Sequence, residues 1–87
     1  MKPVVYYAPW CPDTEPFFTE LARLNADVEK VNMVENSAGL KAFLKLRDSH
    51  SAFDDAKKNG YIGIPALVLE NGDVILDKEQ LTTIFTK

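Results

Sequence analysis

Sulfur and imidazole side chains are scarce in this sequence. It contains one cysteine, Cys11, and one histidine, His50. A lone cysteine cannot form a disulfide within its own chain, and this pair supplies too few ligands for a zinc or iron–sulfur site in one chain. We therefore predict no metal site. Free thiols stay reduced in the cytoplasm, which is the expected location.

The sequence also lacks a long apolar run and an excess of basic charge. No stretch is long enough to span a bilayer, and the N-terminal residues lack the apolar core of a signal peptide. The 10 basic and 13 acidic residues give a net charge of −3, with no basic stripe. Phosphate-backbone binding needs such a stripe. We therefore expect neither a membrane nor a nucleic-acid partner.

The composition is that of an ordinary globular domain. Of the 87 residues, 46% are hydrophobic and 26% are charged, which is typical of soluble domains. A chain of this length folds as one domain and buries roughly 60–65% of its unfolded surface. No linker, repeat or low-complexity tract divides it. We predict a single domain over residues 1–87.

The first part of the chain predicts a strand, a helix and a second strand. Residues 3–7 contain a near-continuous apolar run, which is typical of a strand buried on both faces. Residues 28–34 predict the second strand. Between them, apolar residues recur at helical spacing and Asn25 closes the helix. These apolar positions are Phe17, Phe18, Leu21 and Leu24.

The middle of the chain is helical and interrupted once. Apolar residues recur at helical spacing from Leu40 to Leu44, with Ser37 as the expected N-cap. We expect His50 to be an exposed connector at the interruption. Ser51 then resembles the cap of a short helix that ends at Asn59-Gly60.

The last part of the chain predicts a hairpin and a final helix. Residues 66–69 and 74–76 are short β-runs, and the Asn71-Gly72 pair between them is a strong hairpin signal. Asp77 and Gln80 then match the N-cap and N3 positions of a last helix. The order is therefore β-α-β-α-β-β-α. The helix between the first two strands makes them parallel. We expect an α/β fold with a mixed four-stranded sheet flanked by helices.

Cys11 occupies the segment between the first strand and the first helix. If Cys11 is the N-cap, Pro12 takes the first helical position and backbone N–H groups point at the sulfur, with the Thr14 hydroxyl as a further donor. If the helix begins later, at Asp13 or Thr14, Cys11 lies in a preceding turn and receives less help from the helix dipole. Acidic neighbours limit activation of the sulfur in either case.

Three features together resemble the glutaredoxins of the thioredoxin-fold superfamily. Cys11-Pro12 follows the first strand, Gly63-Ile64-Pro65 precedes the third strand, and the Asn71-Gly72 hairpin leads into a final helix. The segment Ala8-Pro9-Trp10-Cys11 is closer to the thioredoxin form of the motif. The resemblance covers nearly the whole chain and implies the thioredoxin-like fold in its short glutaredoxin form.

The resemblance also implies a substrate groove beside the thiol. It implies a cis Ile64-Pro65 bond that brings the Ile64 backbone next to Cys11, whereas the local sequence alone favours a trans proline that opens a strand. Trp10 either offers an apolar platform to a substrate or packs against the first helix. The expected substrate contacts come from six residues: Trp10, Pro12, Thr14, Ile64, Pro65 and Asp77.

Two departures from the glutaredoxin pattern concern the ligand. Many glutaredoxins carry a cation shortly before the cysteine and a Gly-Gly pair after the fourth strand; this chain has neither. Asp77 and Lys78 remain as partners for an amino group and a carboxylate. No cofactor is required, and glutathione or a similar thiol is the candidate ligand. Monothiol relatives that hold a [2Fe–2S] cluster typically carry Cys-Gly-Phe-Ser where this chain has Cys-Pro-Asp-Thr, so we expect no cluster.

The residue pattern supports two classes of function. In the first, a monothiol oxidoreductase, Cys11 exchanges with the mixed disulfide of a small thiol or a protein, and an external thiol resolves the product because Thr14 replaces a second cysteine. In the second, a non-catalytic binding module or redox sensor, the groove at Trp10, Cys11 and Ile64-Pro65 binds an extended segment. We expect a monomer, with a dimer linked through Cys11 as the alternative.

Overall fold

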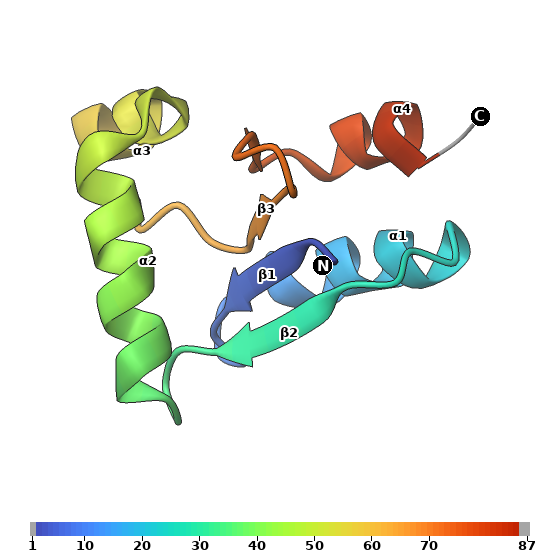
Figure 1. Cartoon of the computed structure of the whole chain (residues 1–87), viewed down its shortest axis with the longest axis horizontal. Coiled ribbons are helices and arrows are strands. Elements are labelled where there is room, and N and C mark those ends of the chain that lie inside the picture. The colour runs from blue at the N-terminus through green and yellow to red at the C-terminus, as the bar shows by residue number, and fades with distance from the viewer. Residues whose placement is uncertain (1, 86–87) are drawn as a thin grey trace.

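The computed structural model describes residues 2–85 and has an α/β architecture (Figure 1). The strands are β1 (Val4–Tyr7), β2 (Glu29–Asn32), β3 (Ala66–Val68) and β4 (Val74–Ile75). The helices are α1 (Thr14–Arg23), α2 (Ser37–Ser49), α3 (Asp54–Asn59) and α4 (Leu81–Phe85). Two 3₁₀ turns, η1 (Ser51–Phe53) and η2 (Lys78–Gln80), precede α3 and α4. No helix within residues 2–85 combines the length and apolar character needed to cross a membrane.

The sheet is mixed and has the order β2-β1-β3-β4. The central strand β1 runs parallel to β2, with Tyr6 opposite Val31, and antiparallel to β3, with Tyr6 opposite Ala66. The β3–β4 pair is antiparallel. The predicted parallel pair, the hairpin at Asn71-Gly72 and the mixed four-stranded sheet are therefore confirmed.

Helices cover both faces of the sheet. Successive residues of a strand point to opposite faces, so each strand contributes side chains to both of the packed layers. On one face, Val5 and Leu67 belong to a buried cluster that also contains Phe17 of α1 and Leu81 of α4. On the other face, Ala66 packs with the fully buried rings of Phe43 and Phe53. Figure 1 shows α2 and α3 together on one side of the molecule, away from α1 and α4. The end of β1, from which the chain continues to Cys11, therefore lies between the two packed layers.

The two strand tyrosines show the same alternation. Tyr6 packs against Phe43, with ring centroids 5.9 Å apart, and Tyr7 packs edge-on against Phe18 at 4.8 Å. They therefore serve opposite faces, as their adjacent positions require. Tyr7 lies on the face of the sheet that α1 covers, and Tyr6 lies on the face that α2 covers.

Most helix ends follow the expected polar and glycine signals. Asn25 has a φ of 54°, and the N–H groups of Asn25 and Ala26 return to the carbonyls of Ala22 and Leu21, which is a Schellman closure. Gly60, with a φ of 77°, closes α3 in the same way. The N-cap of α2 differs from the prediction by one residue. Asn36, not Ser37, accepts a hydrogen bond from the Gly39 N–H at 2.9 Å.

The connection between α2 and α3 corrects two expectations. His50 is partly buried and its Nδ1 accepts the Ala52 N–H at 3.0 Å, so the imidazole caps η1 in place of Ser51. Its Nε2 lies 3.0 Å from the Gly72 carbonyl oxygen in the β3–β4 turn. His50 is therefore a structural bridge between two turns, because both ring nitrogens already have backbone partners.

The cap before the last helix is also displaced. Asp77 accepts the Glu79 N–H at 3.0 Å, as an N-cap does, but the turn that it closes is η2. The α-helix proper begins at Leu81. A short 3₁₀ turn at a helix N-terminus is common, and here it brings Asp77 and Lys78 to the end of β4.

Candidate functional site

The segment from Ala8 to Thr14 is a hydrogen-bonded turn that ends where α1 begins. The Cys11 N–H donates to the Ala8 carbonyl at 3.1 Å, and the Thr14 N–H donates to the Cys11 carbonyl at 3.1 Å. Asp13 is the N-cap of α1 and makes no side-chain cap bond. Of the two predicted starts, the later one is therefore correct, and Cys11 lies in the preceding turn.

This start also explains how α1 tolerates Pro16. With Asp13 as N-cap, Pro16 is the third helical residue, and the first i to i−4 bond runs from the Phe17 N–H to the Asp13 carbonyl at 3.2 Å. The N–H groups of the first helical turn have no intrahelical partner. Proline therefore removes no helical hydrogen bond at this position.

Thr14 has a structural role in the turn. Its side chain is buried, with 6% exposure, and its hydroxyl donates to the Ala8 carbonyl at 2.8 Å. The hydroxyl proton is therefore directed at Ala8 and not at the sulfur, while Thr14 still lines the hollow that contains Trp10, Cys11 and Pro12. Thr14 instead ties the first turn of α1 to the end of β1 and so fixes the path of the Cys11 turn.

Cys11 faces the backbone of Ile64. The Ile64-Pro65 bond is cis, as expected, and the partly buried Cys11 thiol donates to the Ile64 carbonyl oxygen with Sγ and O 3.7 Å apart. Both Ile64 and Pro65 are buried. The thiol form makes this contact through its proton, whereas a thiolate would place negative charge against a carbonyl oxygen. This contact therefore holds the sulfur against the loop that precedes β3.

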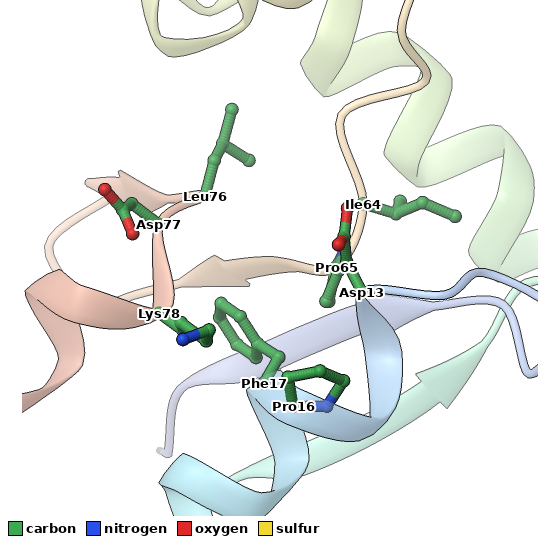
Figure 2. Close-up of a pocket in the computed structure, with 8 residues that line it drawn as sticks. All are labelled: Asp13, Pro16, Phe17, Ile64, Pro65, Leu76, Asp77 and Lys78. Atoms are coloured by element: carbon green, nitrogen blue, oxygen red, sulfur yellow. The ribbon is translucent and has the colours of Figure 1, made fainter.

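A cleft of about 350 Å³ opens beside this contact, and we call it the Pro65 cleft. Figure 2 shows that its wall comes from three places: the start of α1, the Ile64-Pro65 segment, and the residues that follow β4. The side chain of Phe17 lies in the middle of the view, between the other two groups. The lining residues are Asp13, Pro16, Phe17, Ile64, Pro65, Leu76, Asp77 and Lys78.

A second cleft of about 360 Å³ continues from the first along the same segment, and we call it the Tyr61 cleft. The two clefts share Asp13, Ile64, Pro65 and Leu76, so they are adjacent parts of one groove. The second part reaches Tyr61, whose side chain is 66% exposed, and Asp55 at the start of α3.

Trp10 and Pro12 belong to a different hollow. This shallow hollow of about 680 Å³, the Trp10 hollow, lies on the α1 side of the turn and includes Tyr7, Cys11 and Phe18. Trp10 is 64% exposed, and Lys30 lies over the Phe18 ring with its Nζ 5.0 Å from the ring centroid. Cys11 thus lines the hollow that also contains Trp10 and Pro12. It meets the other concavity, which Ile64, Pro65 and Asp77 line, through its contact with the Ile64 carbonyl.

The Pro65 cleft carries charged groups of both signs. Asp13 and Asp77 supply carboxylates and Lys78 an ammonium group, with Asp55 in the adjoining cleft. The sequence predicted Asp77 and identified Lys78, but it missed Asp13, Pro16, Phe17 and Leu76. Helical periodicity marked Phe17 only as a core residue, and no local signal distinguishes a core side chain from one that also lines a cleft.

Comparison with known proteins gives one relative. The chain is 52% identical over 84 residues to an uncharacterized protein from Haemophilus influenzae, and the match covers 97% of this chain and 98% of that protein. The chain therefore belongs to the same family as the Haemophilus protein. No protein-family profile matches the chain. No solved structure matches it either.

Proposed function

We propose that this chain is a glutaredoxin-like protein with a thioredoxin-like fold and that it carries out monothiol thiol–disulfide exchange through Cys11. The observation that carries the proposal is the pairing of the Cys11 thiol with the Ile64 carbonyl, 3.7 Å away, at the edge of the Pro65 cleft. The mixed sheet in the order β2-β1-β3-β4 and the cis Ile64-Pro65 bond support the fold assignment.

The exchange has two balanced steps. The Cys11 thiolate attacks one sulfur of a disulfide, the S–S bond breaks, and the departing sulfur leaves as a thiolate that takes up a proton. A second, external thiolate then attacks the substrate sulfur of the mixed disulfide, which releases a new disulfide between the two small thiols and expels Cys11 as a thiolate that takes up a proton. This scheme needs a supply of small thiols, which the cytoplasm provides. Thr14 takes no part, because its hydroxyl is bound to Ala8.

The charges around the cleft bear on the substrate class. Glutathione disulfide carries net negative charge, whereas the Pro65 cleft offers the carboxylates of Asp13 and Asp77 against the single ammonium group of Lys78. In the neighbouring hollow, the negative charge of Glu15 is matched by the positive charge of Lys30, so the excess of carboxylates lies in the Pro65 cleft. Like charges repel in such a site. We therefore favour a neutral or cationic small disulfide, or a basic protein segment, over glutathione disulfide.

Intact-mass measurement tests the exchange. The reduced protein is incubated with a small neutral disulfide and with glutathione disulfide, then weighed before and after addition of excess thiol. We expect a single adduct that the thiol removes, and no adduct in the Cys11→Ser variant. If the wild-type protein gains no mass from any disulfide and resists alkylation at Cys11, the exchange proposal is wrong. A mass of two chains under non-reducing conditions would indicate the Cys11-linked dimer instead.

The second candidate is a non-catalytic binding module. It is favoured by the groove that continues from the Pro65 cleft into the Tyr61 cleft. Two adjoining clefts that share the Ile64-Pro65 segment could accommodate an extended peptide that runs along it. In that case peptide binding would persist in Cys11→Ser, which titration calorimetry with a panel of basic peptides would detect.

A further inference from the structure

The loop that presents the Ile64 carbonyl has little regular structure of its own. It links α3 to β3 over residues 60–65, and its first anchor is the closure of α3, where the Tyr61 N–H donates to the Ala56 carbonyl at 2.8 Å. The next two side chains contribute little burial, because Tyr61 is 66% exposed and Ile62 is 45% exposed. Packing of these side chains therefore does not fix the loop.

Arg47 of α2 holds this loop by its backbone. Its Nε donates to the Ile62 carbonyl at 2.8 Å, and its Nη2 donates to the Tyr61 carbonyl at 2.6 Å. A planar guanidinium is suited to two parallel donations of this kind, whereas a lysine offers a single point charge. Arg47 is partly buried. Successive carbonyls of an irregular loop thus share one cationic partner on a neighbouring helix.

Gly63 lies between the two carbonyls that Arg47 binds and the Ile64 carbonyl that faces Cys11. Its φ is 92°, and a Cβ at this position would lie 2.7 Å from the Phe53 ring, which is itself fully buried. The loop therefore lies against the core immediately after the two carbonyls that Arg47 binds. The next carbonyl along the chain is that of Ile64, which accepts the Cys11 thiol.

We propose that Arg47 is a positioning residue for Cys11: through the Tyr61 and Ile62 carbonyls it sets the distance between the Ile64 carbonyl and the sulfur. Because that carbonyl accepts from the thiol but not from the thiolate, a loop that withdraws leaves a sulfur that ionises more readily. The same withdrawal moves the wall of the Pro65 cleft, against which a disulfide would align. Only the effect on the alignment of a disulfide in the Pro65 cleft rests on the proposed function.

The pH profile of Cys11 alkylation tests the proposal. Iodoacetamide rates are measured against pH for wild type, Arg47→Met and Arg47→Lys, with Lys41→Met as a matched loss of an exposed cation from α2. For Arg47→Met we expect the midpoint to fall by a few tenths of a pH unit, which makes alkylation at neutral pH roughly twofold to threefold faster. Arg47→Lys reaches one carbonyl at a time, so its midpoint should lie between those of Arg47→Met and wild type. Lys41→Met should match wild type.

A purely structural role for Arg47 would lower stability and leave the profile of the folded protein unchanged. Profiles are therefore compared at a temperature where circular dichroism shows each variant folded. Superimposed profiles for wild type and Arg47→Met would overturn the proposal. If Arg47→Met does not fold, the profile of Arg47→Lys tests the proposal instead. An alkylation profile of Arg47→Lys that superimposes on that of wild type would contradict the proposal equally.

The exchange rate separates this inference from the proposed function. If wild type forms no mixed disulfide, the proposed function fails, but the alkylation profiles still test Arg47. If wild type exchanges, the ratio of exchange rate to alkylation rate should fall in Arg47→Met, because the cleft wall has moved while the sulfur is more reactive. An unchanged ratio together with an unchanged profile would leave Arg47 no role at Cys11.

Discussion

The Cys11 thiol donates to the Ile64 carbonyl oxygen across 3.7 Å, and the two residues are 53 positions apart in the chain. This contact joins the turn after β1 to the loop before β3, so it depends on both being held in place. The turn is held by Thr14 and the loop by Arg47.

Thr14→Val should destabilise the protein by about 0.5–1.5 kcal/mol. The variant keeps the side-chain shape but removes the 2.8 Å donation to the buried Ala8 carbonyl, which then has only the Cys11 N–H at 3.1 Å as its donor. The loss of one hydrogen bond carries a cost of this order. Urea unfolding monitored by circular dichroism measures the change. Thr14→Ser, which retains the hydroxyl, should recover most of the loss. Equal stability of Thr14→Val and wild type would show that the turn does not need this bond.

Alanine at Gly63 should be far more costly than alanine at Gly60. Both glycines have positive φ, at 92° and 77°, but a Cβ at Gly63 meets the Phe53 ring at 2.7 Å whereas one at Gly60 meets nothing within 4 Å. Gly60→Ala should cost about 1 kcal/mol from backbone strain alone. Gly63→Ala adds an overpacked core and should cost roughly 3 kcal/mol or more. Denaturant unfolding of the two variants compares them, and equal losses would contradict the close packing of Gly63.

Exchange at Cys11 should depend on the charge of the disulfide. Cystamine, 2-hydroxyethyl disulfide and dithiodipropionate are cationic, neutral and anionic reagents of similar size. We expect the cationic reagent to react fastest and the anionic one slowest once each rate is divided by that of neutral iodoacetamide. The preference should weaken as salt is added, since added ions screen partly exposed charges.

Asp13→Asn tests the source of that preference. It removes one carboxylate from the Pro65 cleft and should lower the cationic-to-anionic rate ratio by roughly twofold to fivefold. Glu35→Gln removes a negative charge from an exposed position outside the described clefts and should leave the ratio unchanged. A ratio near one in wild type, or equal ratios in the two variants, would contradict the assignment of substrate charge.

The Glu20–Arg23 pair on α1 should show itself in the acid stability of the protein. A hydrogen bond from Arg23 is the main cause that holds the pKa of Glu20 below its usual range. Since the folded pKa is lower than the unfolded one, the contribution is present above the unfolded pKa and is lost as pH falls through the folded one. The stability difference between wild type and Glu20→Gln should therefore shrink as the pH falls below 4.5, the ordinary pKa of a glutamate. A difference that is independent of pH would contradict the pairing.

Much of the fold could be predicted because each element carries a local signal. The apolar run of β1, the helical spacing in α1 and the Asn71-Gly72 turn each report on neighbours a few residues away. The errors are small shifts where two residues compete for one role. Asn36 and Ser37 can both cap α2, and Asn36 does so. His50 takes the place expected for Ser51 because an imidazole nitrogen accepts a backbone N–H just as a serine hydroxyl does.

The site was less predictable because its key contacts join distant residues. The hydroxyl of Thr14 turns back to Ala8, and Arg47 reaches a loop 14 to 15 positions away. Neither contact leaves a periodic trace in the sequence. Ile64-Pro65 could be placed beside Cys11 only through the resemblance to glutaredoxins, and nothing local indicated that Asp13 would line the same cleft as Asp77.

A catalysed exchange assay measures turnover by Cys11 directly. Loss of 2-hydroxyethyl disulfide is followed in excess small thiol, with increasing amounts of wild-type protein or the Cys11→Ser variant. We expect a rate above the uncatalysed reaction that rises in proportion to the wild-type protein and is absent with Cys11→Ser. A wild-type rate no greater than that of Cys11→Ser, at any protein concentration, would contradict it.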